Sequence, residues 1–216
     1  MRHCASVLLL GGLLALIPPP TQGQSGVQYG LALGVNRATL ESPAALGARW
    51  SFVGGGVVRT PLYGPLALQS ELLLSQEGAE VDADDGGAIE YGAGYLELPL
   101  LIHLTVPPVQ SVISYGEAGG FGAIKLFERQ TPGTGNLNIP IPSDATFFDR
   151  INAGIVVGIG ADISIGERTF NLTVRRKWGL VDVAQNVENQ PFSDLGAEFP
   201  ARGRTRTWSA LLRLGL

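Results

Sequence analysis

The sequence predicts an all-β fold, an eight-stranded antiparallel up-and-down transmembrane barrel, and three observations carry this prediction. Large apolar residues alternate with small or polar ones at the period of two that is typical of β-strands between two environments. Eight such stretches follow one another, joined alternately by short turns and by longer polar segments. Only 16% of the 216 residues are charged and 30 are glycine, which is typical of a folded β domain and not of a disordered chain.

The N-terminal segment 1–24 is expected to be a signal peptide, which leaves 25–216 as the barrel domain. Arg2 precedes an apolar core over 7–17 that is too short to span a membrane, and small or polar residues follow at 21–23. A buried N-terminal helix or a membrane anchor is the alternative.

The first two strands are expected over 27–36 and 49–59, and the next two form a hairpin over 66–104. In each of them the large apolar side chains share one face, opposite small, polar or charged residues. The apolar faces comprise Tyr29, Leu31, Leu33, Val35, Trp50, Phe52 and Val58 in the first pair, and Leu66, Leu68, Leu72, Leu74, Leu96, Leu98, Leu100, Ile102 and Leu104 in the hairpin.

The hairpin resembles the signature hairpin of the PorT-like outer-membrane β-barrel family, whose members show an LQxELLYSQKG strand followed by YLEIPLL. The matching residues are Gln69, Glu71, Leu72, Leu73, Ser75, Gln76, Gly78, Tyr95, Leu96, Glu97, Pro99, Leu100 and Leu101. Leu74 stands where the family usually has Tyr, and Glu77 where it usually has Lys. The resemblance implies an outer-membrane barrel of a Gram-negative bacterium. The founding member of the family assists protein secretion.

The last four strands are expected over 112–126, 150–163, 169–180 and 205–216. Alternation is regular in the last three, whereas glycines blur it in the first, where a bulge near Gly119 is expected to shift the register. The chain ends in Leu216, where outer-membrane strands commonly end in an aromatic residue, and this departure bears on assembly more than on fold.

The connections alternate in length, and this alternation orients the barrel. Short turns join the second strand to the third, the fourth to the fifth and the sixth to the seventh. The longer, polar connections are 37–48, 77–92, 127–149 and 181–204. Because bacterial outer-membrane barrels have short periplasmic turns and long extracellular loops, both termini are expected on the periplasmic side and all four long connections outside.

The polarity of the two faces indicates that the apolar face points outward into lipid. A soluble barrel needs a water-exposed face rich in charges, whereas the non-aliphatic face here carries Gly, Ala, Ser, Asn and a few isolated charges. Trp50, Trp178 and Trp208 share the aliphatic face near the long connections, so an outer aromatic girdle is expected, with Arg176 reaching the headgroups beside it. Three core tryptophans in a soluble sandwich are the alternative.

Charged residues on the opposite face are expected to fill the lumen. Glu71 and Glu97 are predicted to be neighbours on the third and fourth strands. The cations available on the opposite wall are Arg175, Lys177 and Arg213. At least one Glu–Arg contact is therefore expected to cross the lumen and plug it, and a structural ion-pair core is favoured over a proton or ion path at this barrel size.

No catalytic, cofactor or metal site is predicted. His103 lies on the inward face near the periplasmic end, too far along the strand from Glu97 to be its close partner, so a polar plug residue is favoured over a catalytic one. The acidic segment 77–90 could gather calcium, but its spacing does not match an EF-hand loop, and a solvated acidic loop is the default. Cys4, the only cysteine, lies in the signal segment, so no disulfide is expected.

These observations favour a non-enzymatic integral protein of the cell outer membrane that acts in envelope structure, surface interaction or secretion assistance. The expected partners are outer-membrane lipid and lipopolysaccharide, the barrel assembly machinery during insertion, and an unknown surface or secretion partner. A net charge of −4 gives no indication of nucleic-acid binding. The alternatives are a small-solute channel, a lipid-modifying outer-membrane enzyme, or a soluble periplasmic barrel that binds a ligand inside.

Overall fold

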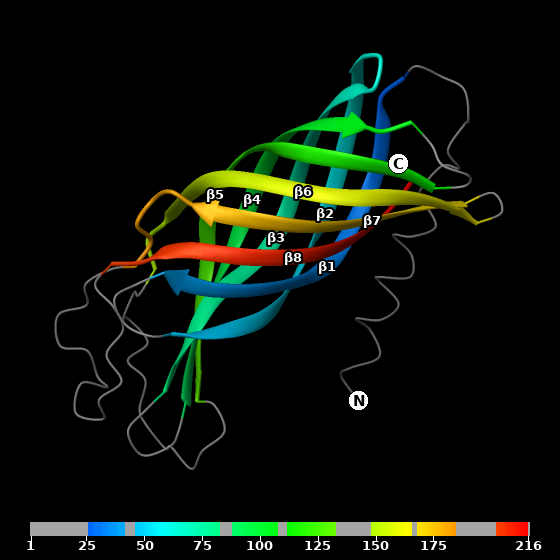
Figure 1. Ribbon diagram of the computed structural model, residues 1–216. Coiled ribbons are helices and arrows are strands. Elements are labelled where there is room, and N and C mark those ends of the chain that lie inside the picture. Colours follow the sequence, from blue (N-terminus) through cyan, green and yellow to red (C-terminus); the bar gives the residue numbers. More distant parts are fainter. Residues whose placement is uncertain are drawn as a thin grey trace, which may run out of the picture.

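The computed structural model is a closed barrel in which every strand is hydrogen-bonded to the next and β8 returns to β1 (Figure 1). The structure describes residues 26–41, 46–82, 88–107, 112–132, 148–165, 168–184 and 202–215. Within these ranges the strands are β1 (Gln28–Glu41), β2 (Gly47–Tyr63), β3 (Leu66–Asp82), β4 (Ala88–Thr105), β5 (Val112–Pro132), β6 (Ile151–Ile165), β7 (Arg168–Gly179) and β8 (Arg204–Leu214). All neighbouring pairs are antiparallel. No helix in the described ranges is long and apolar enough to cross a membrane.

The alternation predicted from the sequence separates the inside of the barrel from the outside. Phe52 is 76% exposed, whereas its chain neighbours Ser51 and Val53 are only 8% and 5% exposed. Along most of the strands the large aliphatic side chains cover the outer surface. The inward positions hold charged and polar side chains together with small apolar clusters, to one of which Val53 belongs. A soluble barrel has the opposite arrangement, and lipid is the solvent that suits this one.

Strands β1 to β5 extend farther at the long-connection end than the sequence predicts. The segment 77–92, expected to be a loop, is mostly strand, because β3 continues to Asp82 and pairs residue by residue with the start of β4. The 21 residues of β5 likewise exceed the 9–11 residues that a spanning strand needs. The backbone pairing continues here, but the outer face is no longer apolar. Prediction from alternation needs an apolar face, so it misses these strand ends.

The register of β5 corrects one prediction. No shift occurs near Gly119, since β5 pairs with β6 without interruption from Val112 to Ile124. The shift lies instead between Gly94 and Tyr95 of β4. The sequence pattern is blurred because Tyr115 and Phe121 point inward with only 3% and 5% exposure, and aromatic rings in the lumen make the two faces look alike.

Four predictions fall on residues outside the described ranges. These concern the signal peptide 1–24, the cysteine it contains, the terminal Leu216, and the two acidic residues Asp84 and Asp85 of the segment considered for calcium. Among the described residues no group of three or more His, Cys, Asp or Glu side chains could hold a metal ion.

Candidate functional site

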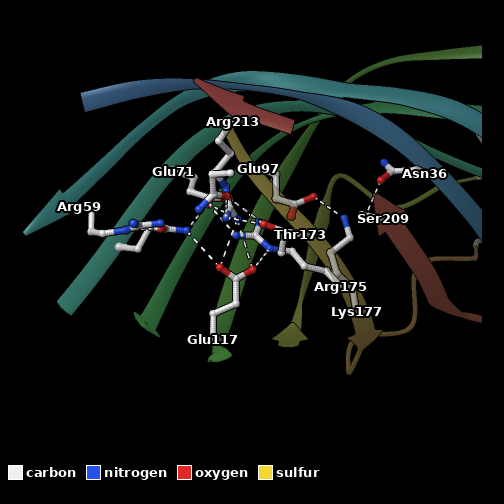
Figure 2. A network of polar contacts seen from close by, with 12 residues as sticks. Asn36, Arg59, Glu71, Glu97, Glu117, Thr173, Arg175, Lys177, Ser209 and Arg213 are labelled. Carbon is white, nitrogen blue, oxygen red and sulfur yellow. Dashed lines mark hydrogen bonds and ion pairs between the residues drawn. The ribbon is translucent and has the colours of Figure 1, made fainter. Parts of the chain in front are cut away.

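A cluster of charged side chains crosses the middle of the lumen (Figure 2). It comprises Glu71 on β3, Glu117 on β5, Arg175 on β7 and Arg213 on β8. All four are at most 3% exposed. Since β3 and β7 are four strands apart in the closed order, they form opposite walls, and their contact closes the space between them.

Arg175 is the centre of this cluster. Its Nη1 and Nη2 atoms donate to the two oxygens of Glu71, each at 2.6 Å, which is the paired geometry that suits guanidinium and carboxylate groups. Its Nε donates to Glu117. Arg175 therefore binds two walls of the barrel at once.

Arg213 supports the same two carboxylates from β8. Its Nη2 lies 3.1 Å from Glu71 Oε1 and 3.2 Å from Glu117 Oε2. Its Nη1 donates to Thr173 Oγ1 at 2.7 Å and to Asn171 Oδ1 at 3.0 Å. The two Nη atoms are thus held by charged groups on one side and by neutral acceptors on the other, whereas Nε has no hydrogen-bond partner among the described residues.

Charge is balanced in this part of the lumen. On the short-turn side of the central cluster, Arg59 donates from Nε to Gln69 Oε1 at 3.0 Å, and its Nη1 lies 4.0 Å from Asp162 Oδ2. Together with the central four, these side chains make three cations and three carboxylates. A balanced and interlinked set is the arrangement in which buried charges are tolerated.

A second cluster lies nearer the long-connection end. Lys177 Nζ is 2.8 Å from Glu77 Oε1 and 2.6 Å from Glu97 Oε2. Asn152 Nδ2 donates to the other oxygen of Glu77 at 3.0 Å. The Phe121 ring stands 5.3 Å from the ammonium nitrogen, so an aromatic face covers the cluster.

Apolar side chains pack beside the second cluster and beyond it toward the long-connection end. Phe148, Val183 and Ala184 come from the segments that flank β6 and β7, and they pack with Leu40, Ala79, Tyr91, Ala93, Tyr95, Leu101, Phe121, Ala123 and Val156. Phe148 and Ala184 form an isolated β-bridge, and the amide of Asp149 donates to the carbonyl of Val183 at 2.7 Å. Strand ends and connecting segments thus form a cap over the ion pairs.

Residues 21–185 match the family described as "outer membrane protein beta-barrel domain". This match covers most of the chain. The chain belongs to this family. It is accordingly a protein of the outer membrane, and no curated protein matches it in sequence.

Similar solved structures are also outer-membrane barrels. OprG from Pseudomonas aeruginosa is 13% identical, with 89% of this chain and 97% of that chain covered and a TM-score of 0.48. Neisserial surface protein A is 11% identical, with coverage of 88% and 99% and a TM-score of 0.49. AlkL in DMPC bilayers is 10% identical, with coverage of 92% and 92% and a TM-score of 0.44. The family assignment rests on the sequence match and not on these structures.

The lumen of this outer-membrane barrel departs from the prediction in one pairing. Glu71 and Glu97 were expected to be neighbours. They lie on adjacent strands but one inward position apart, because Leu73 and not Glu71 is the residue opposite Glu97. The two carboxylates therefore bind different cations, Glu71 the arginines and Glu97 the lysine. A shift of one inward position between β3 and β4 determines which cation each carboxylate binds. This register cannot be derived from the alternation along a single strand.

Three carboxylates of the lumen clusters, Glu77, Glu117 and Asp162, and the cation Arg59 were missing from the predicted set. Glu117 was obscured by the aromatic residues on its face, and Glu77 was assigned to a loop. Both follow the period of two. Glu77 is six residues after the predicted inward residue Glu71, and Glu117 is eight residues before Lys125, the other charged residue of the predicted strand 112–126. Strict extension of the alternation finds them.

His103 lies inside the barrel near the short-turn end, as its position in the alternation predicts. It is 1% exposed, and its ring stacks on Tyr115 with centroids 4.4 Å apart. Its Nδ1 atom has no hydrogen-bond partner among the described residues. A general base needs a partner that orients it, and the described structure shows none for His103 Nδ1.

The three tryptophans lie on the outer surface at the long-connection end. Trp50 and Trp208 are 66% and 48% exposed, and the Arg176 guanidinium lies over the rings of Trp208 and Trp178 at 4.9 and 5.8 Å from their centroids. At the other end Tyr63 is 86% exposed on the outer surface. Aromatic residues thus occur near both rims, as in barrels that span a bilayer.

Proposed function

We propose that this protein is a closed, non-enzymatic barrel of the outer membrane, whose lumen is a structural ion-pair core. Its function is then carried by its outer surface and by the parts that project from the membrane: envelope structure, surface interaction or secretion assistance. The observation that supports this most is the contact of Arg175 with Glu71 and Glu117, which joins opposite walls of the lumen.

Three features support the absence of a conducting path. The central cluster is almost inaccessible to solvent, the Lys177 cluster stands above it, and an apolar cap lies over both. An eight-stranded barrel leaves an interior just wide enough for side chains to fill. An ion would have to displace paired, buried charges to pass, which costs several kcal/mol for each group left unpaired.

Electrical recording in planar bilayers tests this proposal. The purified wild-type protein is expected to give no discrete conductance steps. Arg175→Ala together with Glu117→Ala, which empties the centre of the lumen, is the positive comparison and is expected to leak. Stable wild-type conductance steps that change size in Glu71→Gln would contradict the proposal and favour the small-solute channel.

Secretion assistance is the finer role that we propose within this class. The match of the β3–β4 hairpin to the PorT-like signature supports it. Glu71 and Glu97 belong to that signature, and their role is to stabilise the barrel through ion pairs in the lumen. Deletion of the gene followed by analysis of the secreted proteins is the test. Unchanged secretion alongside an altered outer-membrane barrier would favour an envelope role instead.

The lipid-modifying enzyme is the competing candidate. The candidate catalytic residue of such an enzyme is His103, which is buried against Tyr115. We expect His103→Ala to leave the composition of the outer-membrane lipids unchanged. A specific lipid species that depends on His103 would overturn the non-enzymatic assignment.

A further inference from the structure

Arginine and tryptophan alternate in a row across the outer surface of four neighbouring strands. Cross-strand pairing places Arg176 of β7 beside Trp208 of β8, Trp208 beside Arg37 of β1, and Arg37 beside Trp50 of β2. The strands follow one another in the barrel wall (Figure 1). Four consecutive outward positions at one level of the barrel are therefore occupied in turn by a cation and an indole.

A second row repeats the pattern two residues farther out. Trp178 of β7 pairs with Arg206 of β8, and Arg206 pairs with Thr39 of β1. Beyond it, Arg204 pairs with Glu41. We call the residues Arg37, Arg176, Arg204, Arg206, Trp50, Trp178 and Trp208 the Arg–Trp patch.

The cations of the patch exceed its anions. Glu41 forms an ion pair with Arg206, and among the described residues of β1, β2, β7 and β8 it is the only carboxylate. Arg37 and Arg176 pair with no carboxylate in the part of the chain that the structure describes. Arg176 is held instead over two indole rings, which fixes its direction without neutralising its charge.

The patch lies where the apolar outer surface gives way to the projecting strand ends, which is where the outer headgroups are expected if the long connections face outside. An aromatic girdle alone needs tryptophan or tyrosine at this depth. Unpaired guanidinium groups need anions, and they bind phosphate with two parallel hydrogen bonds. Arg37 and Arg176 flank Trp208 on strands about 10 Å apart at normal sheet spacing, which suits a headgroup with more than one phosphate.

We propose that the Arg–Trp patch binds the phosphate groups of a phosphorylated glycolipid in the outer leaflet. Arg37 and Arg176 contact phosphate, and the indole faces of Trp208 and Trp50 contact the sugar rings between the phosphates. The inference rests on the outer-membrane location of the barrel but not on its closed lumen, so conductance by the wild type would leave it intact.

The tryptophans provide the assay. The chain contains three tryptophans, and all of them lie in the patch, so intrinsic fluorescence reports on this surface alone. The full-length protein in dodecyl maltoside with EDTA is titrated with diphosphorylated lipid A, with chemically dephosphorylated lipid A, and with phosphatidylglycerol. We expect a saturable change of tryptophan emission with the diphosphorylated lipid only.

The variants locate the effect. Arg37→Gln with Arg176→Gln is expected to weaken the response about 100-fold, or about tenfold for each arginine lost. Arg129→Gln is the matched control, because Arg129 is exposed on β5, across the barrel from β1, and its loss changes the net charge in the same direction. The single variant Arg37→Gln serves if the double variant does not fold, and heat-dependent gel migration checks folding.

Three outcomes would overturn the proposal. Equal responses to lipid A with and without phosphate would mean that the patch is an aromatic girdle only. Equal responses to phosphatidylglycerol and lipid A would mean attraction to any anionic lipid. An equal loss in the Arg129→Gln control would mean that net charge, and not the patch, governs binding.

Discussion

Removal of Arg175 from the lumen is the most informative test of the ion-pair core. Arg175→Met keeps most of the side-chain volume but leaves the two carboxylates of Glu71 and Glu117 with Arg213 as their only shared cation. Three hydrogen bonds are lost, two of them 2.6 Å long. The balance of three cations and three carboxylates in this part of the lumen becomes an excess of one negative charge.

The expected cost follows from these contacts. Breaking a buried ion pair by removing one partner costs about 3–5 kcal/mol of unfolding free energy. Arg213 still lies 3.1 and 3.2 Å from the two carboxylates, so we expect the lower end, about 3 kcal/mol. Arg175→Met combined with Glu117→Gln restores the balance of charge and is expected to lie within about 1–2 kcal/mol of the wild type, because apolar or neutral replacements of a whole buried pair are often close to neutral.

Urea titration of the protein in lipid vesicles measures these differences, with gel migration and tryptophan emission as two independent probes of folding. Arg129→Met is the control, since Arg129 is exposed on the outside of β5. The double-mutant cycle isolates the coupling between Arg175 and Glu117. Additive effects of the two substitutions, or a cost of Arg175→Met no larger than that of the control, would refute the view that the lumen is held by these ion pairs.

Three further predictions concern other parts of the barrel. A Cβ atom on Gly160 would clash with Tyr115 Oη, whereas one on Gly122 meets nothing within 4 Å. Gly160→Ala is therefore expected to lower the unfolding free energy by about 1–3 kcal/mol and Gly122→Ala to leave it unchanged; similar urea midpoints for the two would contradict this. Lys177→Met leaves Glu77 and Glu97 buried without their cation and is expected to lower the urea midpoint more than Lys125→Met, because the Lys125–Glu128 pair is more exposed, with side-chain exposures of 14% and 17%; the reverse order would count against the second cluster. His103→Phe keeps the ring contact with Tyr115 and removes a buried nitrogen that lacks a partner, so stability is expected to stay the same or to rise by up to about 1 kcal/mol; a clear loss in the urea titration would reveal a bond that His103 makes.

The outward and inward faces of the strands follow from the sequence alone. Leu72 and Leu74 are exposed on the outer surface and Glu71 and Ser75 are buried inside, as their order in the chain requires, since successive side chains of a strand point to opposite faces. The number of strands, their order and the inversion of polarity follow from the same local rule. In an up-and-down barrel each strand pairs with the strand that follows it in the chain, so no long-range information is needed. Where the outer face stops being apolar, as in the segment 77–92, the rule loses its signal although the backbone pairing continues.

The partners inside the lumen were decided only by the tertiary structure. Which cation meets Glu97 depends on the register between strands and on the closure of the barrel, which brings β3 and β4 opposite β7 and β8. The same holds outside, where Arg37 stands between Trp208 and Trp50 because strands from the two ends of the chain pair with each other. Alternation along one strand determines whether a side chain faces the lumen or the lipid. Its partners on other strands are determined by the register and closure of the sheet.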